Sequence, residues 1–360
     1  MAGALLAWRL ARRCDVERVG IAVGGGRDRD ATAASGGACR GFETEAGQRK
    51  LAIDSLVELL SDERLRDWAG YTETGSVYRP VHTGAIEAGA AEIAAAVPNS
   101  VSLLTAADLR ERGWAGDSEG RDDDAVVAVA ERRAGYLDPE RLRTRVLADL
   151  ADRAAVELLP DGDVTDLAPG SFRLGGKSYR ADVVVLATGA WTPALLRAAG
   201  FADDRLRTKA IQYTVFGTDS WRPGTFVDEV SGLYGKPAGD RQLMGLPTDV
   251  WDADPDQPGG LQPDQALSDA VVRHAQGRFP QLRLVADARP VVALDCYSAD
   301  FRLALRPVPG TGGRLYTFTG GSGGAAKTVL AASAQAAAQL AAGAEPNHHH
   351  LRSTEIGDSE

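Results

Sequence analysis

The chain has 360 residues, 44% of them hydrophobic and 25% charged, and its formal net charge is −10. This length allows two domains or one interrupted domain, and this composition is typical of a globular protein. The acidic balance argues against nucleic acid or an anionic membrane surface as a partner, because both require basic patches.

Cysteine usage and hydropathy exclude further classes of protein. Cys14, Cys39 and Cys296 are too widely spaced for a disulfide framework or a paired metal site, so we expect a reducing, cytoplasmic setting and no metal. Three arginines interrupt the apolar N-terminal segment too early for a signal peptide, and no later stretch approaches transmembrane length.

The first half of the chain contains alternating predicted helices and strands. In order they are a helix over 2–13, a strand over 19–23, a helix over 48–60, a turn and helix over 79–96, a strand and capped helix over 101–112, and a helix over 138–150. Asp138 as N-cap and Pro139 after it mark the start of the helix over 138–150. Short antiparallel strands are expected over 156–159, 164–167 and 171–174, with a hairpin turn at Gly175–Gly176.

The second half opens on Ala181–Ala187, a continuous apolar run typical of a strand buried on both faces of a parallel sheet. A turn at residues 188–193 and a helix over 194–199 follow it. The remaining predicted elements are strands over 211–216, 232–234 and 242–246, a helix over 267–279 and a strand over 291–297.

The C-terminal stretch Leu315–Gly343 combines a strand, a glycine turn and a helix. Leu315–Thr319 is a predicted strand, four glycines and a serine follow, and an alanine-rich helix then has no breaker before Gly343. Such a unit directs backbone N–H groups and a helix dipole at an electron-rich ligand. The alternative is an ordinary strand–helix unit with a glycine loop. The tail over 346–360 is expected to be disordered.

Four segments together resemble the D-amino-acid oxidase, glycine oxidase and sarcosine oxidase superfamily of FAD-dependent amine oxidoreductases. They are the opening helix with ATAASGGACR, the helix start GYLDPERL, the run ADVVVLATGAWTPALL, and the closing CYSAD…LYTFTGGSGGAAKT. The resemblance implies an α/β fold, with a Rossmann-like FAD-binding domain interrupted by a mixed-sheet, α+β substrate domain. We place the FAD-binding domain at 1–60, 131–205 and 296–345, and the substrate domain at 61–130 and 206–295.

The N-terminus departs from the family pattern. The family opens with a strand and G-x-G-x-x-G, which places the FAD pyrophosphate on the first helix. Gly3 falls at the third glycine, without the strand and the first two glycines, so we expect either that the start codon lies further upstream or that the protein is a natural truncation. Asp28 is the acidic residue that could hold the adenosine ribose; otherwise it is a solvated loop charge.

The resemblance also assigns residues to the cofactor. Ser35, Gly36 and Arg40 would lie over the flavin, although Arg40 could instead be a surface arginine beside Glu43. Glu43 stands where relatives have an arginine for the substrate carboxylate, which opens the possibility of a cationic or amine substrate. Contacts to the ADP half would come from Val164 at the adenine and from a turn formed by Thr188, Gly189 and Trp191, which is otherwise only a tight strand-to-helix turn.

Further positions concern the flavin ring and its reoxidation. Residues against the ring would be Gly321, Ser322, Gly323 and Gly324. Lys327 would meet the flavin or the substrate carboxylate and, with Arg40, act as a catalytic residue. Cys296 is a candidate for a covalent FAD link or else a small buried hydrophobe. Leu243 replaces the oxygen-activating lysine, which favours a dehydrogenase over an oxidase.

The resemblance implies oxidation of the C–N bond of an amino acid or secondary amine by hydride transfer to flavin N5, giving an imine. A non-catalytic flavoprotein-like remnant is the first alternative, and an FAD dehydrogenase that uses an acceptor other than oxygen is the second. An NAD-dependent dehydrogenase is disfavoured, because the C-terminal flavin loop would have no role in it. The oligomeric state stays open.

Overall fold

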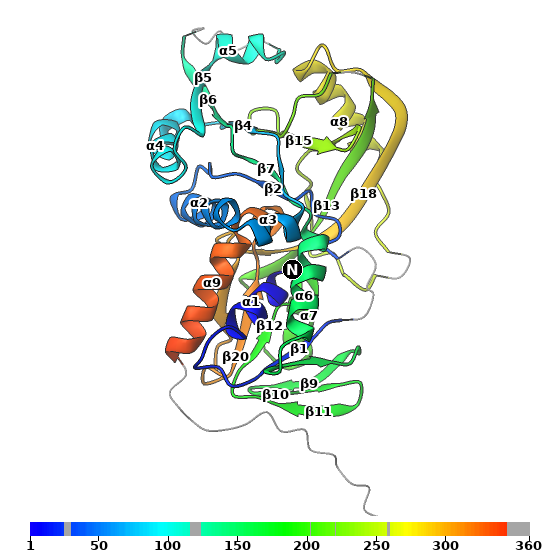
Figure 1. Ribbon diagram of the computed structural model, residues 1–360. Helices are drawn as coiled ribbons and strands as arrows, with labels where there is room; N and C mark the ends of the chain where they lie inside the picture. Colours follow the sequence, from blue (N-terminus) through cyan, green and yellow to red (C-terminus); the bar gives the residue numbers. More distant parts are fainter. Residues whose placement is uncertain (25–29, 116–123, 202, 220, 258–259, 344–360) are drawn as a thin grey trace, which may run out of the picture.

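The computed structural model describes residues 1–24, 30–115, 124–201, 203–219, 221–257 and 260–343. The chain forms two regions (Figure 1). The lower region surrounds helices α1 (Ala2–Leu10) and α9 (Ala325–Gly343), and the upper region surrounds a large mixed sheet. Asp28 and the predicted tail over 346–360 lie outside the described residues.

The lower region contains two small sheets with parallel pairs of strands. In one, β1 (Val19–Ala22) runs parallel to β8 (Val156–Leu159). In the other, β12 (Val184–Leu186) runs parallel to β20 (Leu315–Thr319), which also pairs with β19 (Ala304–Pro307). Within the described chain, β1 pairs only with β8 and β12 only with β20. One edge of β1 and one edge of β12 are therefore unpaired.

The assignment of 156–159 to an antiparallel group was wrong, because β8 pairs with a strand 137 positions earlier in the sequence. Its four residues carry no signal for the direction of their partner. The other two strands of that group, β9 (Val164–Ala168) and β10 (Ser171–Leu174), do form an antiparallel sheet, together with β11 (Lys177–Arg180). Gly175 and Gly176 have φ values of 56° and 83°, which suits the predicted two-residue hairpin turn.

Helices pack around these sheets and against one another. They are α1, α2 (Ala46–Ser61), α3 (Glu63–Ala69), α6 (Pro139–Ala151), α7 (Thr192–Ala198) and α9. Asp138 caps α6 by accepting a hydrogen bond from the N–H of Arg141, which confirms the predicted start. The buried side chains of Leu5, Trp8 and Phe318 form part of the common core.

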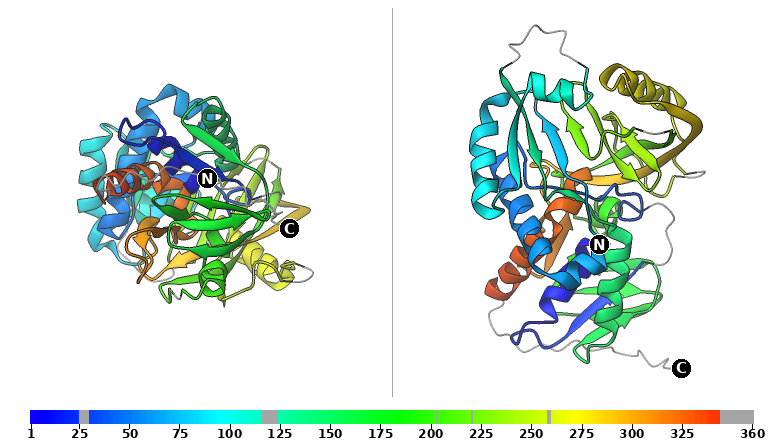
Figure 2. Two further views of the ribbon diagram at one scale, coloured as in Figure 1. Left: turned by 90° about the horizontal axis from the view of Figure 1, so that it is seen from below. Right: turned by 45° about the horizontal axis from the view of Figure 1, so that its top comes forward.

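The upper region is a nine-stranded sheet with the order β17-β13-β16-β15-β14-β4-β6-β5, and β18 pairs with β13. Its strands are β4 (Ser76–Arg79), β5 (Val101–Thr105), β6 (Val126–Glu131), β13 (Leu206–Thr218), β14 (Phe226–Asp228), β15 (Leu233–Ala238), β16 (Arg241–Gly245), β17 (Val250–Trp251) and β18 (Leu284–Ser298). Helices α4 (Ile86–Ala96), α5 (Ala106–Glu111) and α8 (Gln265–Arg278) flank it, with α4 and α8 on opposite sides (Figure 2).

Two strands are much longer than their sequence patterns predicted. β13 and β18 pair from Leu206 opposite Ser298 to Thr218 opposite Leu284, and they reach from the upper region to the cavity described below. Strands β4, β6, β14 and β19 were not predicted, because each depends on neighbours distant in sequence. Of the described helices, none is long and apolar enough to cross a membrane.

Candidate active site

A cavity of about 2960 Å³ lies where the two regions meet. It is larger than the roughly 300–1,000 Å³ of a typical small-molecule pocket. Its walls include the unpaired edges of β1 and β12, the first turn of α1, and parts of β13, β15 and β18. The site residues predicted from the sequence all line it: Gly3, Ser35, Gly36, Arg40, Val164, Thr188, Gly189, Trp191, Cys296, Gly321, Ser322, Gly323, Gly324 and Lys327.

The glycine turn between β20 and α9 is held rigidly against β18. Gly320 has φ 89°, a region that favours glycine, and its carbonyl accepts hydrogen bonds from the N–H of Ser298 at 3.0 Å and from Ser298 Oγ at 2.9 Å. A Cβ atom at Gly320 would lie 2.7 Å from Ser298 Cβ. This anchoring fixes the following turn and directs the N-terminus of α9 toward the cavity.

Replacing Gly320 by alanine is therefore expected to destabilise the fold by about 1–3 kcal/mol, because it combines an unfavourable φ with a steric clash. The apparent affinity for FAD should fall with it. Gly277 of α8 provides the control, since a Cβ there meets no atom within 4 Å and alanine favours the helix. Denaturant unfolding of both variants checks this, and equal stability of the two would contradict it.

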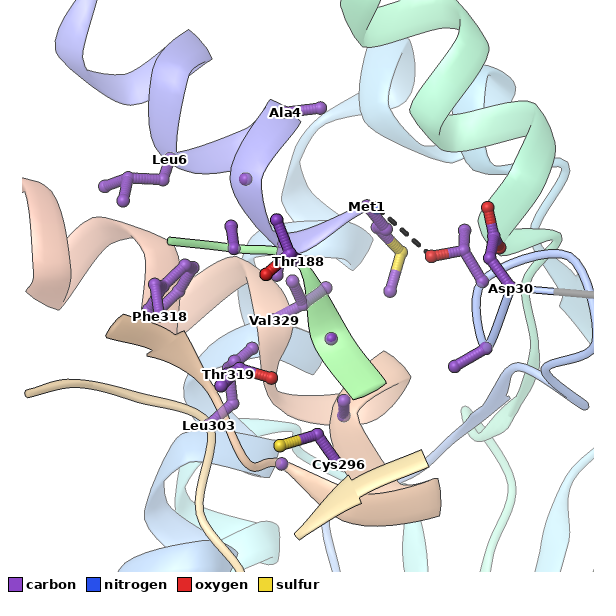
Figure 3. Close-up of a pocket in the computed structure, with 18 of the residues that line it drawn as sticks. Met1, Ala4, Leu6, Asp30, Thr188, Cys296, Leu303, Phe318, Thr319 and Val329 are labelled. Atoms are coloured by element: carbon purple, nitrogen blue, oxygen red, sulfur yellow. Dashed lines mark hydrogen bonds between the residues drawn. The ribbon is translucent and has the colours of Figure 1, made fainter. Parts of the chain in front are cut away.

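The ADP half of the predicted site gathers at the start of α1 and the end of β12 (Figure 3). A Cβ atom at Gly3 would lie 2.7 Å from Ala187 Cβ, so glycine permits the close contact between helix and strand. Gly189 has φ 53°, and Thr188 Oγ1 lies 2.9 Å from Thr192 Oγ1 across the turn. The close helix contact and the positive φ explain why glycine stands at positions 3 and 189. The contacts of these residues with the cofactor remain a prediction.

Arg40 is not a surface arginine, because only 6% of it is exposed. Its Nη2 lies 2.7 Å from Glu43 Oε1, and the same oxygen lies 2.8 Å from Lys327 Nζ. Burial acts to raise the pKa of Glu43, but the charges of Lys327 and Arg40 outweigh it and hold the pKa below its ordinary value. A lysine in the first turn of a helix is disfavoured by the helix dipole unless an anion lies nearby, and the anion beside Lys327 is Glu43 of the protein itself.

Cys296 and Leu243 occupy the positions that the resemblance singled out. Cys296 is 6% exposed, and burial raises its pKa to about 11, so its thiol is protonated at neutral pH. Leu243 lines the cavity opposite Lys236 of the neighbouring strand β15. Burial lowers the pKa of Lys236 to about 8, and its Nζ lies 3.9 Å from the ring centroid of Tyr136. No motif in the sequence singled out Lys236.

Asp295 is a second cavity residue that the sequence reasoning missed. It lies on β18 directly opposite Lys209 of β13, and it is the one acidic residue in the apolar run VVALDCY. Burial raises its pKa to about 7. A lone carboxylate in a predicted buried strand was the available signal.

Replacing Asp295 by asparagine is expected to stabilise the protein most at high pH. Its folded pKa is raised from 3.8 to about 7, so the folded state binds more protons than the unfolded state between these values. The stability of the parent protein therefore falls as pH rises through this window, and the asparagine variant avoids that loss. Tm should exceed that of the parent clearly at pH 8 and by less at pH 5.

Asp252 is the control for this pH dependence, because Arg207 lowers its pKa through a hydrogen bond. Asp252→Asn should give no gain in Tm at pH 8. A gain from Asp295→Asn that is the same at both pH values would contradict the prediction.

Glycine turns, helix N-termini and a cavity between a parallel sheet and a second sheet are the features expected of a dinucleotide-binding site. The chain matches the family model "FAD dependent oxidoreductase" over residues 1–340. It belongs to this family, and the resemblance predicted from the sequence is confirmed. FAD is its cofactor, and the cavity fits it: backbone glycines and the N-terminus of α9 suit a flat, anionic ligand.

Solved structures of similar fold extend the comparison. Glycine oxidase from Geobacillus kaustophilus is 20% identical, with a TM-score of 0.66 over 96% of this chain and 92% of that one. L-proline dehydrogenase from P. horikoshii is 16% identical, with a TM-score of 0.72 over 95% and 91%. L-amino acid deaminase from Proteus vulgaris is 15% identical, with a TM-score of 0.68 over 96% and 92%. Among curated proteins none matches this chain.

Proposed function

We propose that this protein oxidises the C–N bond of an amino acid or secondary amine to an imine. The observation that carries the proposal is that the glycine turn, the N-terminus of α9, Arg40 and Lys327 line one cavity with the tyrosine-bearing strands β13, β15 and β18. A family of FAD-dependent oxidoreductases and neighbours named as amino acid oxidases and dehydrogenases support the same chemistry.

Bound FAD supplies the acceptor for the hydride that leaves the carbon next to nitrogen. The protein would contribute positioning and electrostatics. Arg40 and the positive end of α9 would stabilise negative charge that develops on the cofactor side of the cavity. The wall of β13, β15 and β18 would exclude water from the reacting carbon, and the low dielectric there would strengthen both electrostatic effects.

We infer that FAD is held without a covalent bond. The ADP half would lie along Gly3, Val164 and the turn at Thr188–Trp191, and the ring along Gly321–Gly324. Cys296 would serve as a small hydrophobe, because a protonated, buried thiol is a poor nucleophile.

The test is the visible absorption spectrum of the purified protein, reconstituted with FAD if necessary, before and after acid precipitation. Flavin bands released into the supernatant are expected, and a panel of amines and amino acids should then bleach the bands under anaerobic conditions. Bands retained in the pellet would overturn the non-covalent assignment. A protein that stays colourless with added FAD would favour the non-catalytic remnant.

Leu243 favours a second candidate, in which an acceptor other than oxygen reoxidises the flavin. Mixing the reduced protein with oxygen and with a quinone decides between the two. Slow reaction with oxygen and fast reaction with the quinone are expected. A fast reaction with oxygen that is lost in Lys236→Met would show that Lys236 takes the role of the oxygen-activating lysine. That result would overturn the dehydrogenase hypothesis.

A further inference from the structure

We propose that Asp295 and the tyrosines beside it bind a second cationic group of the substrate, so that the preferred substrates are diamines and related dibasic amines. The inference rests on the proposed function and names the substrate class of the same cavity. It follows from where the carboxylate lies, from what surrounds it, and from how the other charges of the cavity are already paired.

Asp295 lies at the glycine turn. A Cβ atom built on Gly323 would be 3.5 Å from Asp295 Oδ2, and Tyr297 two residues later forms a bridge with Gly321. Among the described residues, none forms a hydrogen bond or an ion pair within 4.0 Å with the carboxylate of Asp295. Burial is the cause of its raised pKa. A carboxylate in this state gains free energy when a cation enters the cavity.

Three tyrosines share the wall with this carboxylate. Tyr213, Tyr234 and Tyr297 line the cavity from β13, β15 and β18. Burial raises the pKa of Tyr234 and Tyr297, and the nearby charge of Asp295 raises both pKa values further. Aromatic faces next to a carboxylate are a common means of binding an organic ammonium group.

The nearby cations do not neutralise Asp295. Lys209 faces it across the strand pair, but the Nζ of Lys209 lies 4.5 Å from the ring centroid of Trp251 and 5.6 Å from that of Tyr297. Lys236 contacts Tyr136 instead. The strand pair therefore presents an anionic position to the cavity.

Unlike Asp295, the two cations expected to bind a substrate carboxylate already have a partner of opposite charge in the protein. Arg40 and Lys327 already share the carboxylate of Glu43, at 2.7 and 2.8 Å. A substrate carboxylate would have to displace Glu43 or approach it against repulsion. The internal pairing thus disfavours simple amino acids, and Asp295 favours a distal ammonium.

The experiment compares two ligands of equal length on the FAD-loaded protein: 1,4-diaminobutane and 4-aminobutanoate. Binding is measured by calorimetry, and flavin reduction is followed separately under anaerobic conditions. We expect the diamine to bind more tightly, and Asp295→Asn to weaken diamine binding about 10–100-fold, as loss of a charged hydrogen bond does. The reversal Asp295→Lys should transfer the preference to 4-aminobutanoate.

Asp256 provides the matched control, because it lines the same cavity but accepts a hydrogen bond from Trp191 Nε1 at 2.9 Å. Asp256→Asn should leave diamine binding unchanged. Equal binding of the two ligands by the parent protein, or a diamine Kd unaffected by Asp295→Asn, would overturn the inference. Binding that depends on Asp295 without flavin reduction by any amine would support the inference and refute the proposed reaction instead.

Discussion

Replacement of Asp228 by asparagine is expected to lower the free energy of unfolding by about 3–5 kcal/mol, because it leaves two arginines without their shared counter-charge in the protein interior. Asp228 is fully buried at the end of β14. Its Oδ1 lies 3.4 Å from Arg79 Nη1, its Oδ2 lies 2.7 Å from Arg278 Nε, and Ser231 Oγ donates to Oδ2 at 2.6 Å.

This cluster joins three elements that are far apart in the sequence, since Arg79 ends β4 and Arg278 ends α8. Denaturant unfolding followed by fluorescence and circular dichroism measures the loss. Asp287→Asn is the control, because Asp287 also lies between two arginines, Arg241 and Arg289, but in solvent. It should change stability little. Similar losses in both variants would show that burial does not set the cost.

Replacement of Glu43 by glutamine is expected to have the second largest effect, and it acts on both stability and ligand preference. The change leaves Arg40 and Lys327 facing each other without a carboxylate in a poorly solvated cavity, which should cost about 2–4 kcal/mol. A small carboxylate can then take the place of Glu43, so affinity for propionate should rise about tenfold or more. Calorimetry on the FAD-loaded protein measures that affinity.

Glu92→Gln is the matched control, because Glu92 binds Arg49 on the surface with its two oxygens at 2.8 Å. It should leave propionate binding unchanged. If Glu43→Gln neither destabilises the protein nor strengthens propionate binding, the pairing of Arg40 and Lys327 with Glu43 does not control the anion preference of the cavity.

Features that depend on neighbouring residues could be predicted from the sequence. The strand Leu315–Thr319 and the helix that ends at Gly343 were predicted with correct limits, because β-branched and aromatic residues, glycines and alanines act through local backbone preferences. The capping box at Thr105 and Asp108 is local in the same way. The family pattern added the expectation that these local units surround the cofactor.

Pairings between distant segments were not predictable in this way. The parallel pairing of β8 with β1 depends on a partner that its own four residues do not specify. The ion pair of Glu43 with Lys327 joins residues 284 positions apart, and nothing in the sequence identified Glu43 as the partner of Lys327. The Asp228 cluster is likewise invisible in sequence, since its three charged residues lie in separate segments.

The sequence by itself determined the cofactor class, the glycine turn between β20 and α9 and the order of the βα units, because these depend on short-range backbone geometry. Only the tertiary structure decided which charged side chains are paired with one another and which line the cavity without a partner. The register of β13 against β18 places Asp295 at the glycine turn, and the packing of α9 places Lys327 on Glu43. Electrostatic preference in a cavity depends on such distances, which the fold sets and residue identity alone does not.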